Sequence, residues 1–418
     1  WGENRLKVLM FGWEFPPNNK GGLGTACYGL TRGLSKQGID ITLVLPKKNE
    51  PHDHVEIIPA DTLYIGNQKI KLQYVNSLLT AYMDNCEYSK EIKNYEESFK
   101  RLITGNTSDS DLYGKDLYSE VHRYAKKAKI IALFEDFDVI HCHDWMTFKA
   151  GIEAKKATGK PLVVHVHATD FDRTGGNPNQ HVYDIERQGM HEADKIITVS
   201  EFTKNMIIKH YGINNEKIKV VHNGIEYSKP KKTEKFGSNE KIVLFLGRLT
   251  LQKGPEYFME AAKKALDIRS DIKFIVAGTG DMYGKMINKA AELGIAKNVL
   301  FTGHLRGDDV DKAYQMADLY VMPSVSEPFG ITPLEALKNN TPVLISNTSG
   351  VSEVLTNALK VDFWDVDEMT NKIVSAVSYG SLNKSLVKNG NKDIKAITWD
   401  KAAKKCVDVY HTVRGIEK

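Results

Sequence analysis

Short apolar segments alternate with stretches of helical periodicity along almost the whole chain, and this alternation restricts the fold more than any other feature of the sequence. Parallel α/β sheets have this pattern, because a helix returns the chain between neighbouring parallel strands. The strands predicted in the first half are residues 6–11, 41–45, 139–142, 162–166, 195–199 and 219–221. They predict a doubly wound α/β unit.

A lysine-rich segment that contains a proline, residues 228–235, separates this pattern from a second one. The strands predicted after it are residues 242–246, 273–277, 299–301, 319–322 and 343–346. A chain of 418 residues with 41% hydrophobic content can bury two cores. We therefore predict two Rossmann-like domains, residues 1–228 and 229–398, that face each other across a cleft. Such sheets bind ligands at the carboxyl ends of their strands, so the cleft should hold the active site.

Two segments lie outside this alternation. Residues 76–114 are polar and rich in aromatic side chains, and they predict an insertion in the N-terminal domain at the rim of the cleft. The insertion contains Asp109-Ser110-Asp111, but metal binding there is disfavoured because this motif belongs to a loop. Residues 399–418 are predicted to form a final helix that packs on another surface. Its apolar stripe is Ala402, Ala403, Cys406, Val407 and Tyr410.

Composition limits the partners and the compartment. The net charge of +4, from 57 basic and 53 acidic residues, gives no reason to expect a nucleic-acid or membrane partner. No apolar run approaches the roughly 18 residues that a membrane-spanning helix needs. The cysteines lack metal-ligand spacing, which favours free thiols in a reducing compartment, and we predict a cytoplasmic protein. They are Cys27, Cys86, Cys142 and Cys406.

Residues 323–335 place two carboxylates, Glu327 and Glu335, eight positions apart across a loop that leads directly into a helix. Backbone N–H groups that converge on a helix N-terminus favour anions and hydroxyl-rich ligands. The segment therefore indicates a nucleotide-sugar site. For Glu335 a structural role is the alternative, because Thr332, Pro333 and Glu335 also fit a capping box.

Two loops are candidates for phosphate binding. Residues 12–24 join a predicted strand to a helix, and Gly21 and Gly22 would let backbone amides approach a pyrophosphate. Their spacing does not match the dinucleotide fingerprint, which disfavours a nicotinamide enzyme. In the second domain, Arg248 and Lys253 lie between a strand and a helix, where cations stabilise a departing nucleoside diphosphate. A plain glycine turn and a solvated pair of cations are the alternatives.

Two predicted strands end in alternating histidines, His141 with His143 and His165 with His167. Alternation places each pair on one face of its strand, so the four imidazoles could in principle converge on zinc. We disfavour zinc, because His141 and His165 should be buried within the strands and the pattern places no carboxylate or thiol on the same face. No metal site is predicted. Glycine-rich turns at strand ends in the second domain are weaker candidates for contacts with the nucleotide base: Gly278 and Leu305.

The Glu-x7-Glu pattern, preceded by Pro-Ser and containing Pro-Phe-Gly, resembles the signature of retaining GT-B glycosyltransferases, chiefly family four and the glycogen and starch synthases. The Arg-x4-Lys spacing matches the donor-phosphate pair of these families. Residues 20–23 are similar to the Lys-x-Gly-Gly-Leu of glycogen synthases, except that Lys20 directly precedes Gly21. The resemblance implies that Glu327 contacts the transferred sugar and Glu335 the ribose. It also implies that the sugar is oriented by backbone amides of Phe329, Gly330 and Ile331.

The same resemblance assigns Asp144 and His167 to sugar hydroxyls near the reacting carbon, with His167 also near the leaving group. Asn223 resembles the Asn-Gly turn of these families at the cleft. The resemblance further implies that the last helix crosses back to the first domain. No cofactor or metal is expected, because Arg248 and Lys253 supply the electrostatic stabilisation that a metal would otherwise give.

The acceptor is indicated by Trp-Glu-Phe-Pro-Pro before Gly-Gly-Leu-Gly, by His-Asp-Trp and by the rim insertion, which look most like compact bacterial or archaeal glycogen synthases. We predict retaining, metal-independent transfer of glucose from UDP-glucose or ADP-glucose to the non-reducing end of an α-1,4-glucan. One alternative is a family-four enzyme with a lipid, oligosaccharide or small-molecule acceptor, for which the basic face of residues 121–129 would be a membrane surface. The other is a catalytically silent nucleotide-sugar-binding protein. The sequence gives no signal for the oligomeric state.

Overall fold

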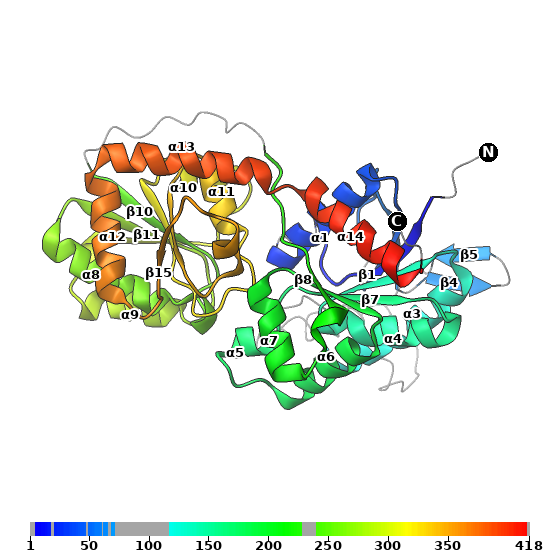
Figure 1. Cartoon of the computed structure of the whole chain (residues 1–418). Helices are drawn as coiled ribbons and strands as arrows, with labels where there is room; N and C mark the ends of the chain where they lie inside the picture. Colours follow the sequence, from blue (N-terminus) through cyan, green and yellow to red (C-terminus); the bar gives the residue numbers. More distant parts are fainter. Residues whose placement is uncertain are drawn as a thin grey trace.

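The computed structural model describes residues 5–17, 21–46, 49–60, 62–65, 68–71, 117–227 and 240–415. In these ranges the chain forms two lobes, each built on its own parallel sheet (Figure 1). The α/β class with two Rossmann-like domains is therefore confirmed. The predicted insertion at residues 76–114 and the linker at residues 228–235 lie outside the described residues, as do Lys20 and Cys86.

The first sheet has the strand order β3-β2-β1-β6-β7-β8-β9, and all of its pairings are parallel. Its strands are β1 (Lys7–Phe11), β2 (Asp40–Leu45), β3 (Glu56–Pro59), β6 (Val139–His143), β7 (Leu162–Val166), β8 (Lys195–Thr198) and β9 (Ile218–Val220). Helices of this lobe are α1 (Gly22–Lys36), α3 (Leu117–Phe134), α4 (Trp145–Thr158), α5 (Asp170–Thr174), α6 (Gln180–Glu192), α7 (Glu201–Tyr211) and the 3₁₀ turn η1 (Asn215–Lys217). A separate antiparallel pair consists of β4 (Thr62–Ile65) and β5 (Gln68–Lys71).

The second sheet has the order β12-β11-β10-β13-β14-β15, again with parallel pairings. Its strands are β10 (Lys241–Leu246), β11 (Ile272–Ala277), β12 (Val299–Gly303), β13 (Leu319–Met322), β14 (Val343–Ser346) and β15 (Leu359–Val361). The helices of this lobe are α8 (Pro255–Ile268), α9 (Tyr283–Glu292), α10 (Asp308–Met316), α11 (Thr332–Lys338), α12 (Val366–Ser378) and α13 (Gly380–Ala396). Short 3₁₀ turns are η2 (Leu251–Lys253), η3 (Ala296–Asn298) and η4 (Gly350–Glu353).

The burial of the central strands explains why their positions could be predicted from the sequence. Every residue of β6, β7, β13 and β14 is buried, because helices cover both faces of each sheet. Such strands appear in the sequence as continuous apolar runs. The alternation did not predict the antiparallel pair β4 and β5, nor the strands β3 and β15. Strands β3 and β15 lie at the edges of their sheets, and both are short and only partly buried.

The C-terminal helix α14 (Trp399–Val413) crosses back to the first lobe and packs on α1, as Figure 1 shows. Two glycines of α1 make the close approach possible. A Cβ atom on Gly29 would lie 2.1 Å from the ring of Trp399, and one on Gly33 would lie 2.7 Å from the carbonyl oxygen of Trp399. The buried residues of α14 are Ala402, Ala403, Cys406, Val409 and Tyr410, so the predicted stripe is correct except that Val409 replaces Val407.

Three of the four cysteines, Cys27, Cys142 and Cys406, are free and buried. Within the described ranges, no helix combines the length and the apolar character that crossing a bilayer requires. Helix α3 buries Val121 and Tyr124 on one face, which agrees with an ordinary amphipathic helix of the lobe.

Candidate active site

The loops that follow β10 and β13 meet at the carboxyl edge of the second sheet, because these two strands are neighbours. Gly254 ends the loop after β10 with a positive φ of 64° and caps the start of α8. A Cβ atom there would lie 2.1 Å from the carbonyl oxygen of Pro323, which begins the loop after β13. Only glycine permits this approach, and it brings Lys253 beside Glu327.

Glu327 is buried in this loop, with 6% of its surface exposed. Its Oε2 atom accepts hydrogen bonds from the Lys253 ammonium and, at 3.2 Å, from the Ser324 hydroxyl. Its backbone pairs with Ser349 in a parallel bridge, which includes a 2.9 Å bond from the Gly350 N–H to the Glu327 carbonyl. Both ends of the residue are thus fixed, and the carboxylate and ammonium form one charged pair.

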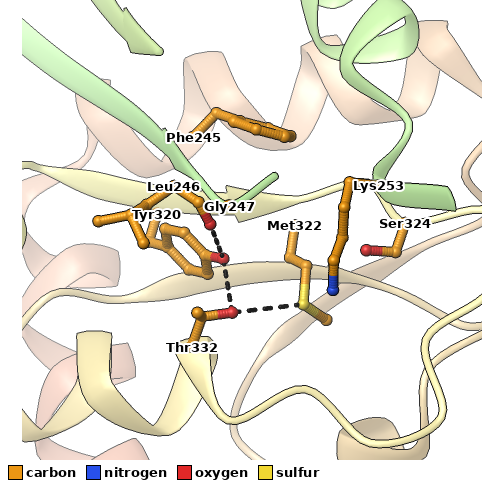
Figure 2. Close-up of a pocket in the computed structure, with 8 residues that line it drawn as sticks. All are labelled: Phe245, Leu246, Gly247, Lys253, Tyr320, Met322, Ser324 and Thr332. Carbon is orange, nitrogen blue, oxygen red and sulfur yellow. Dashed lines mark hydrogen bonds between the residues drawn. The ribbon is translucent and has the colours of Figure 1, made fainter. Parts of the chain in front are cut away.

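A small cavity of about 30 Å³ is lined by Lys253 of this pair (Figure 2). The Tyr320 hydroxyl lies 3.2 Å from the carbonyl oxygen of Leu246 and 2.8 Å from Oγ1 of Thr332, and so joins strand β13 to β10 and α11. The residues that line the cavity are Phe245, Leu246, Gly247, Lys253, Tyr320, Met322, Ser324 and Thr332.

The proposed capping box at the start of α11 is wrong. Ile331 occupies the N-cap position, and the Thr332 hydroxyl contacts Tyr320 and Met322 rather than a backbone N–H of its own helix. Glu335 instead accepts a 3.1 Å hydrogen bond from the hydroxyl of Tyr314, a fully buried residue of α10. Burial raises the pKa of Glu335 above its usual value, and the Tyr314 hydrogen bond partly opposes this shift.

On the facing lobe, Asp144 and His167 follow adjacent strands, β6 and β7, and lie in contact. The backbone N–H of His167 donates to Oδ1 of Asp144 at 2.7 Å, and Arg173 pairs with Oδ2 at 3.3 Å. Asp144 has a positive φ of 59°, a strained conformation for a residue other than glycine, and such strain is concentrated at functional sites. Burial raises the pKa of Asp144 to about 6, against the effect of Arg173.

The imidazole of His167 is uncharged at neutral pH. Burial, and then the positive charge of Arg173, lower the pKa of His167 to about 3. One of its ring nitrogens, Nε2, lies 2.9 Å from Nδ1 of His143. A neutral imidazole can exchange hydrogen bonds with sugar hydroxyls without adding a second cation beside Arg173.

Glu14 and Arg173 were not predicted as site residues. Glu14 follows β1, is 2% exposed, and has its pKa raised to about 7, chiefly by burial. The charges of Arg248 and Arg173 oppose this shift, so Glu14 lies within electrostatic reach of Arg248 from the other lobe. The available signal was a carboxylate between two aromatic residues, Trp13 and Phe15, directly after a strand.

The remaining predicted residues lie around these groups. Gly21 is the N-cap of α1, and a Cβ atom on Gly22 would have no other atom within 4 Å, so this glycine faces open space. Gly278 and Gly330 have positive φ values of 141° and 98°, and a Cβ atom on Gly278 would lie 1.9 Å from the carbonyl oxygen of Gly247. Phe329 and Asn223 are buried, and Leu305 packs against the core of the second lobe.

The two lobes are joined by direct hydrogen bonds near the candidate site. The Ser326 hydroxyl donates to Asp172 of α5 at 2.6 Å, and the Ser200 hydroxyl donates to the carbonyl oxygen of Pro328 at 2.5 Å. These contacts tie the loop that carries Glu327 to the lobe that carries Asp144 and His167. Ile331 and Glu335 do not line the small cavity beside Lys253. They line a second cavity of about 460 Å³, together with residues of α1 and of the start of α14.

Two parallel-sheet lobes with charged loops at facing strand ends define the GT-B class of fold. Residues 107–229 match the family described as "Glycosyltransferase Family 4", and residues 228–393 match "Glycosyl transferases group 1". An uncharacterised glycosyltransferase of Methanocaldococcus jannaschii is 30% identical over 97% of this chain and 98% of its own length. The chain belongs to the group 1/family 4 glycosyltransferases.

Other similarities are more distant. A glycogen synthase of Mycobacterium tuberculosis is 25% identical over 84% of this chain and 80% of its own length. Among solved structures, a sucrose-phosphate synthase from Thermosynechococcus elongatus superposes with a TM-score of 0.73 at 16% identity, over 99% of this chain and 100% of that one. At 16% identity, the similarity to the sucrose-phosphate synthase concerns the fold alone.

Proposed function

We propose that the chain transfers glucose from a nucleoside-diphosphate glucose to the non-reducing end of an α-1,4-glucan, with retention of the α configuration. The observation that carries the proposal is the ion pair between the half-buried Lys253 and the buried Glu327 at the carboxyl edge of the second sheet. The donor binds here with its diphosphate at Lys253 and Arg248. The sugar lies against Glu327 and the backbone amides of residues 329–331.

The reaction requires negative charge to be stabilised on the leaving group. When the bond between the sugar C1 atom and the β-phosphate oxygen breaks, a second negative charge develops on the nucleoside diphosphate. Fixed cations at Lys253 and Arg248 stabilise that charge without rearrangement, so these residues supply the electrostatic stabilisation themselves. The glycine amides at Gly21 and Gly22, at the start of α1, would contact the diphosphate from the facing lobe.

The acceptor hydroxyl attacks C1 on the face from which the diphosphate leaves, and the departing phosphate oxygen takes the hydroxyl proton. Asp144 and the neutral imidazole of His167 hold sugar hydroxyls beside C1, where Arg173 keeps the Asp144 carboxylate in place. The contacts of Ser326 and Ser200 between the lobes keep this arrangement closed and limit the access of water, which would otherwise hydrolyse the donor.

Support for a glucan acceptor comes from the glycogen-synthase-like motifs of the first domain and from the 25% identity to a named glycogen synthase. A direct test incubates the purified chain with UDP-glucose or ADP-glucose, with and without glycogen and with and without EDTA, and measures released nucleoside diphosphate. Release from one donor that glycogen stimulates would support the proposal and identify the base. Bound donor without stimulation by glycogen would overturn the glucan acceptor, and absence of donor binding would overturn the donor site.

A further inference from the structure

Four histidines carried by β6, by β7 and by the residue after β7's end stack against one another. The rings of His141 and His143 have centroids 4.4 Å apart, and those of His141 and His165 are 5.5 Å apart and within 11° of parallel. His167 completes the stack, 4.2 Å from His165. His141, His143 and His165 are buried, with at most 1% of their surfaces exposed.

Several ring nitrogens in this stack have no hydrogen-bond partner among the described residues. They are Nε2 of His141, Nε2 of His143, both nitrogens of His165, and Nδ1 of His167. Buried polar atoms are nearly always satisfied, and a group of unsatisfied ones in a native fold calls for an explanation such as a bound ion. One ring nitrogen from each of His141, His143 and His165 lies within 4.8 Å of those from the other two.

The nitrogens that do have partners follow the pattern of metal-binding histidines. Such a histidine binds the metal through one nitrogen and forms a hydrogen bond through the other, which fixes the ring. His141 Nδ1 lies 2.6 Å from the Tyr410 hydroxyl of α14, and His143 Nδ1 lies 2.9 Å from Nε2 of His167. Both rings therefore keep Nε2 available for a metal.

We propose that His141, His143 and His165 form a binding site for a borderline-soft divalent cation of the first transition series, with Zn²⁺ as the first candidate. The sequence disfavoured zinc because His141 and His165 should be buried; they are buried, but their unsatisfied nitrogens turn that burial into an argument for a metal. Imidazole nitrogen suits this class of metal, whereas Mg²⁺ and Ca²⁺ prefer oxygen ligands. Binding would tilt the near-parallel rings until the nitrogens are about 3.3 Å apart, as Zn–N distances of about 2.0–2.1 Å require.

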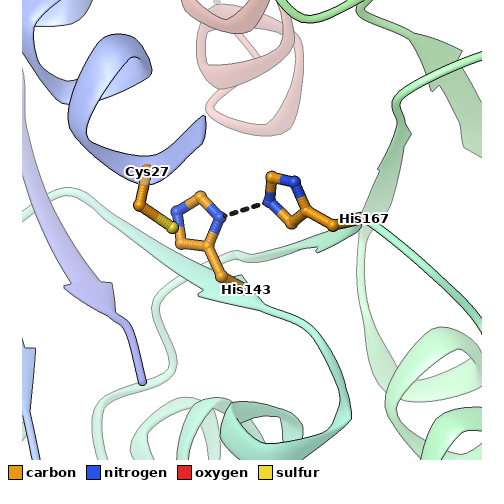
Figure 3. Close-up of side chains that lie close together, drawn as sticks. All are labelled: Cys27, His143 and His167. Atoms are coloured by element: carbon orange, nitrogen blue, oxygen red, sulfur yellow. Dashed lines mark hydrogen bonds between the residues drawn. The ribbon is translucent and has the colours of Figure 1, made fainter. Parts of the chain in front are cut away.

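A neighbouring set of donor atoms, from Cys27, His143 and His167, shares His143 with this site. Figure 3 shows the sulfur of Cys27 on one side of the His143 ring and His167 on the other. We choose the three-histidine set for two reasons. It contains most of the unsatisfied nitrogens, and it leaves His167 available for the sugar. The metal lies within the first lobe and, from this position, stabilises the fold and the orientation of the His143 and His167 rings.

The inference is tested on the full chain without donor or acceptor. The protein is stripped of metal with a chelator, incubated with Zn²⁺, desalted and analysed for metal content, and a parallel sample is loaded with Co²⁺. About one Zn²⁺ per chain is expected, together with the intense visible absorption of Co²⁺ held by the three imidazoles and one water in four-coordinate geometry. Less than a tenth of an equivalent of Zn²⁺, or only the weak absorption of six-coordinate Co²⁺, would overturn the proposal.

The variant His165→Gln, which changes no residue of the proposed donor site, should bind Co²⁺ at least tenfold more weakly and lose the visible bands. His210→Gln on α7, a histidine outside the stack, is the matched control and should bind like the unmodified chain. Equal affinity of His165→Gln and the unmodified chain would overturn the assignment. If His165→Gln does not fold, the Co²⁺ spectrum of the unmodified chain still decides between the two outcomes.

Discussion

The ammonium of Lys253 donates a hydrogen bond to the carboxylate of Glu327, although 74 positions separate the two residues in the chain. Lys253 ends a 3₁₀ turn after β10, and Glu327 lies in the loop after β13. The parallel pairing of β10 with β13 brings these loops together, so the charged pair is a direct product of the sheet order. The order of the strands therefore determines that these two residues meet.

Replacement of Lys253 by alanine should lower kcat/KM for glucosyl transfer about 10²–10³-fold, because one fixed cation at the leaving diphosphate is lost. Glu327→Gln should cause a similar loss while keeping the size of the side chain. Lys285→Ala on α9 removes an exposed ion pair with Glu256 and should leave the rate unchanged. The measurement is steady-state release of nucleoside diphosphate. Rates within twofold of the unmodified chain for Lys253→Ala would contradict the donor-site assignment.

Glu335 and Tyr314 offer a test of whether the second glutamate binds nucleotide or only supports the fold. Glu335→Gln should weaken nucleotide binding while keeping an acceptor for the Tyr314 hydroxyl. Tyr314→Phe removes only the hydrogen bond, and we expect it to cost about 1 kcal/mol of stability with little change in nucleotide affinity. Calorimetric titration with UDP and ADP, together with urea unfolding, separates the two effects. An unchanged nucleotide affinity in Glu335→Gln would assign Glu335 to structure alone.

The raised pKa of Glu14 predicts a pH-dependent stability. The folded chain keeps this proton up to about pH 7, whereas the usual pKa of glutamate is 4.5. Between these values the folded state binds more protons, so the stability linked to Glu14 is complete below pH 4.5 and is lost as the pH rises to about 7. Glu14→Gln should therefore be more stable than the unmodified chain at pH 8, by up to about 3 kcal/mol.

The measurement for Glu14 is urea unfolding of both proteins at pH 4 and pH 8. Other buried carboxylates with raised pKa values, Asp144 and Glu186, are present in both proteins and cancel in the comparison. Glu292→Gln, at an exposed position of α9, is the control substitution. A stability difference of the same size at both pH values would show that Glu14 does not titrate in the predicted range.

Alanine substitutions at two glycines of α1 should have different effects: Gly29→Ala should lower stability, and Gly22→Ala should weaken donor binding. Gly29→Ala places a methyl group against the Trp399 ring, and overpacking of this kind costs about 1–3 kcal/mol. Gly22→Ala meets no neighbour, so it should leave the melting temperature nearly unchanged and weaken donor binding by obstructing the diphosphate. Differential scanning calorimetry and donor titration measure both properties. Equal donor affinity in Gly22→Ala and the unmodified chain would remove the glycine loop from the donor site.

The buried strands were predictable because apolar runs and the lengths of the intervening segments are local properties of the sequence. The charged loops were predictable for a related reason: Arg248, Lys253 and Glu327 lie where strands end, and the carboxyl ends of parallel strands share an edge. The partners within the site were not predictable. The contact of Glu335 with Tyr314 depends on how α10 packs beside α11, and no local spacing encodes that packing.

The burial of polar side chains such as Glu14 could not be predicted from the sequence either. Glu14 follows a strand like many exposed loop residues, and only the position of the facing lobe reveals its proximity to Arg248. The histidine stack was recognised as a pattern on two strands. Its contact with Tyr410 depends on α14, which returns to the first lobe from the far end of the chain.

The return of α14 has a mechanical consequence. Just before this helix, the Ile225 N–H donates to the carbonyl oxygen of Ile397 at 3.1 Å, and Ile225 pairs with Thr398 in a parallel bridge. Ile225, near the end of the segment that forms the first lobe, therefore contacts the segment that returns from the second lobe. The returning segment meets the first lobe at Ile225, close to the point where the chain leaves that lobe, so any opening of the cleft would bend the chain near this residue.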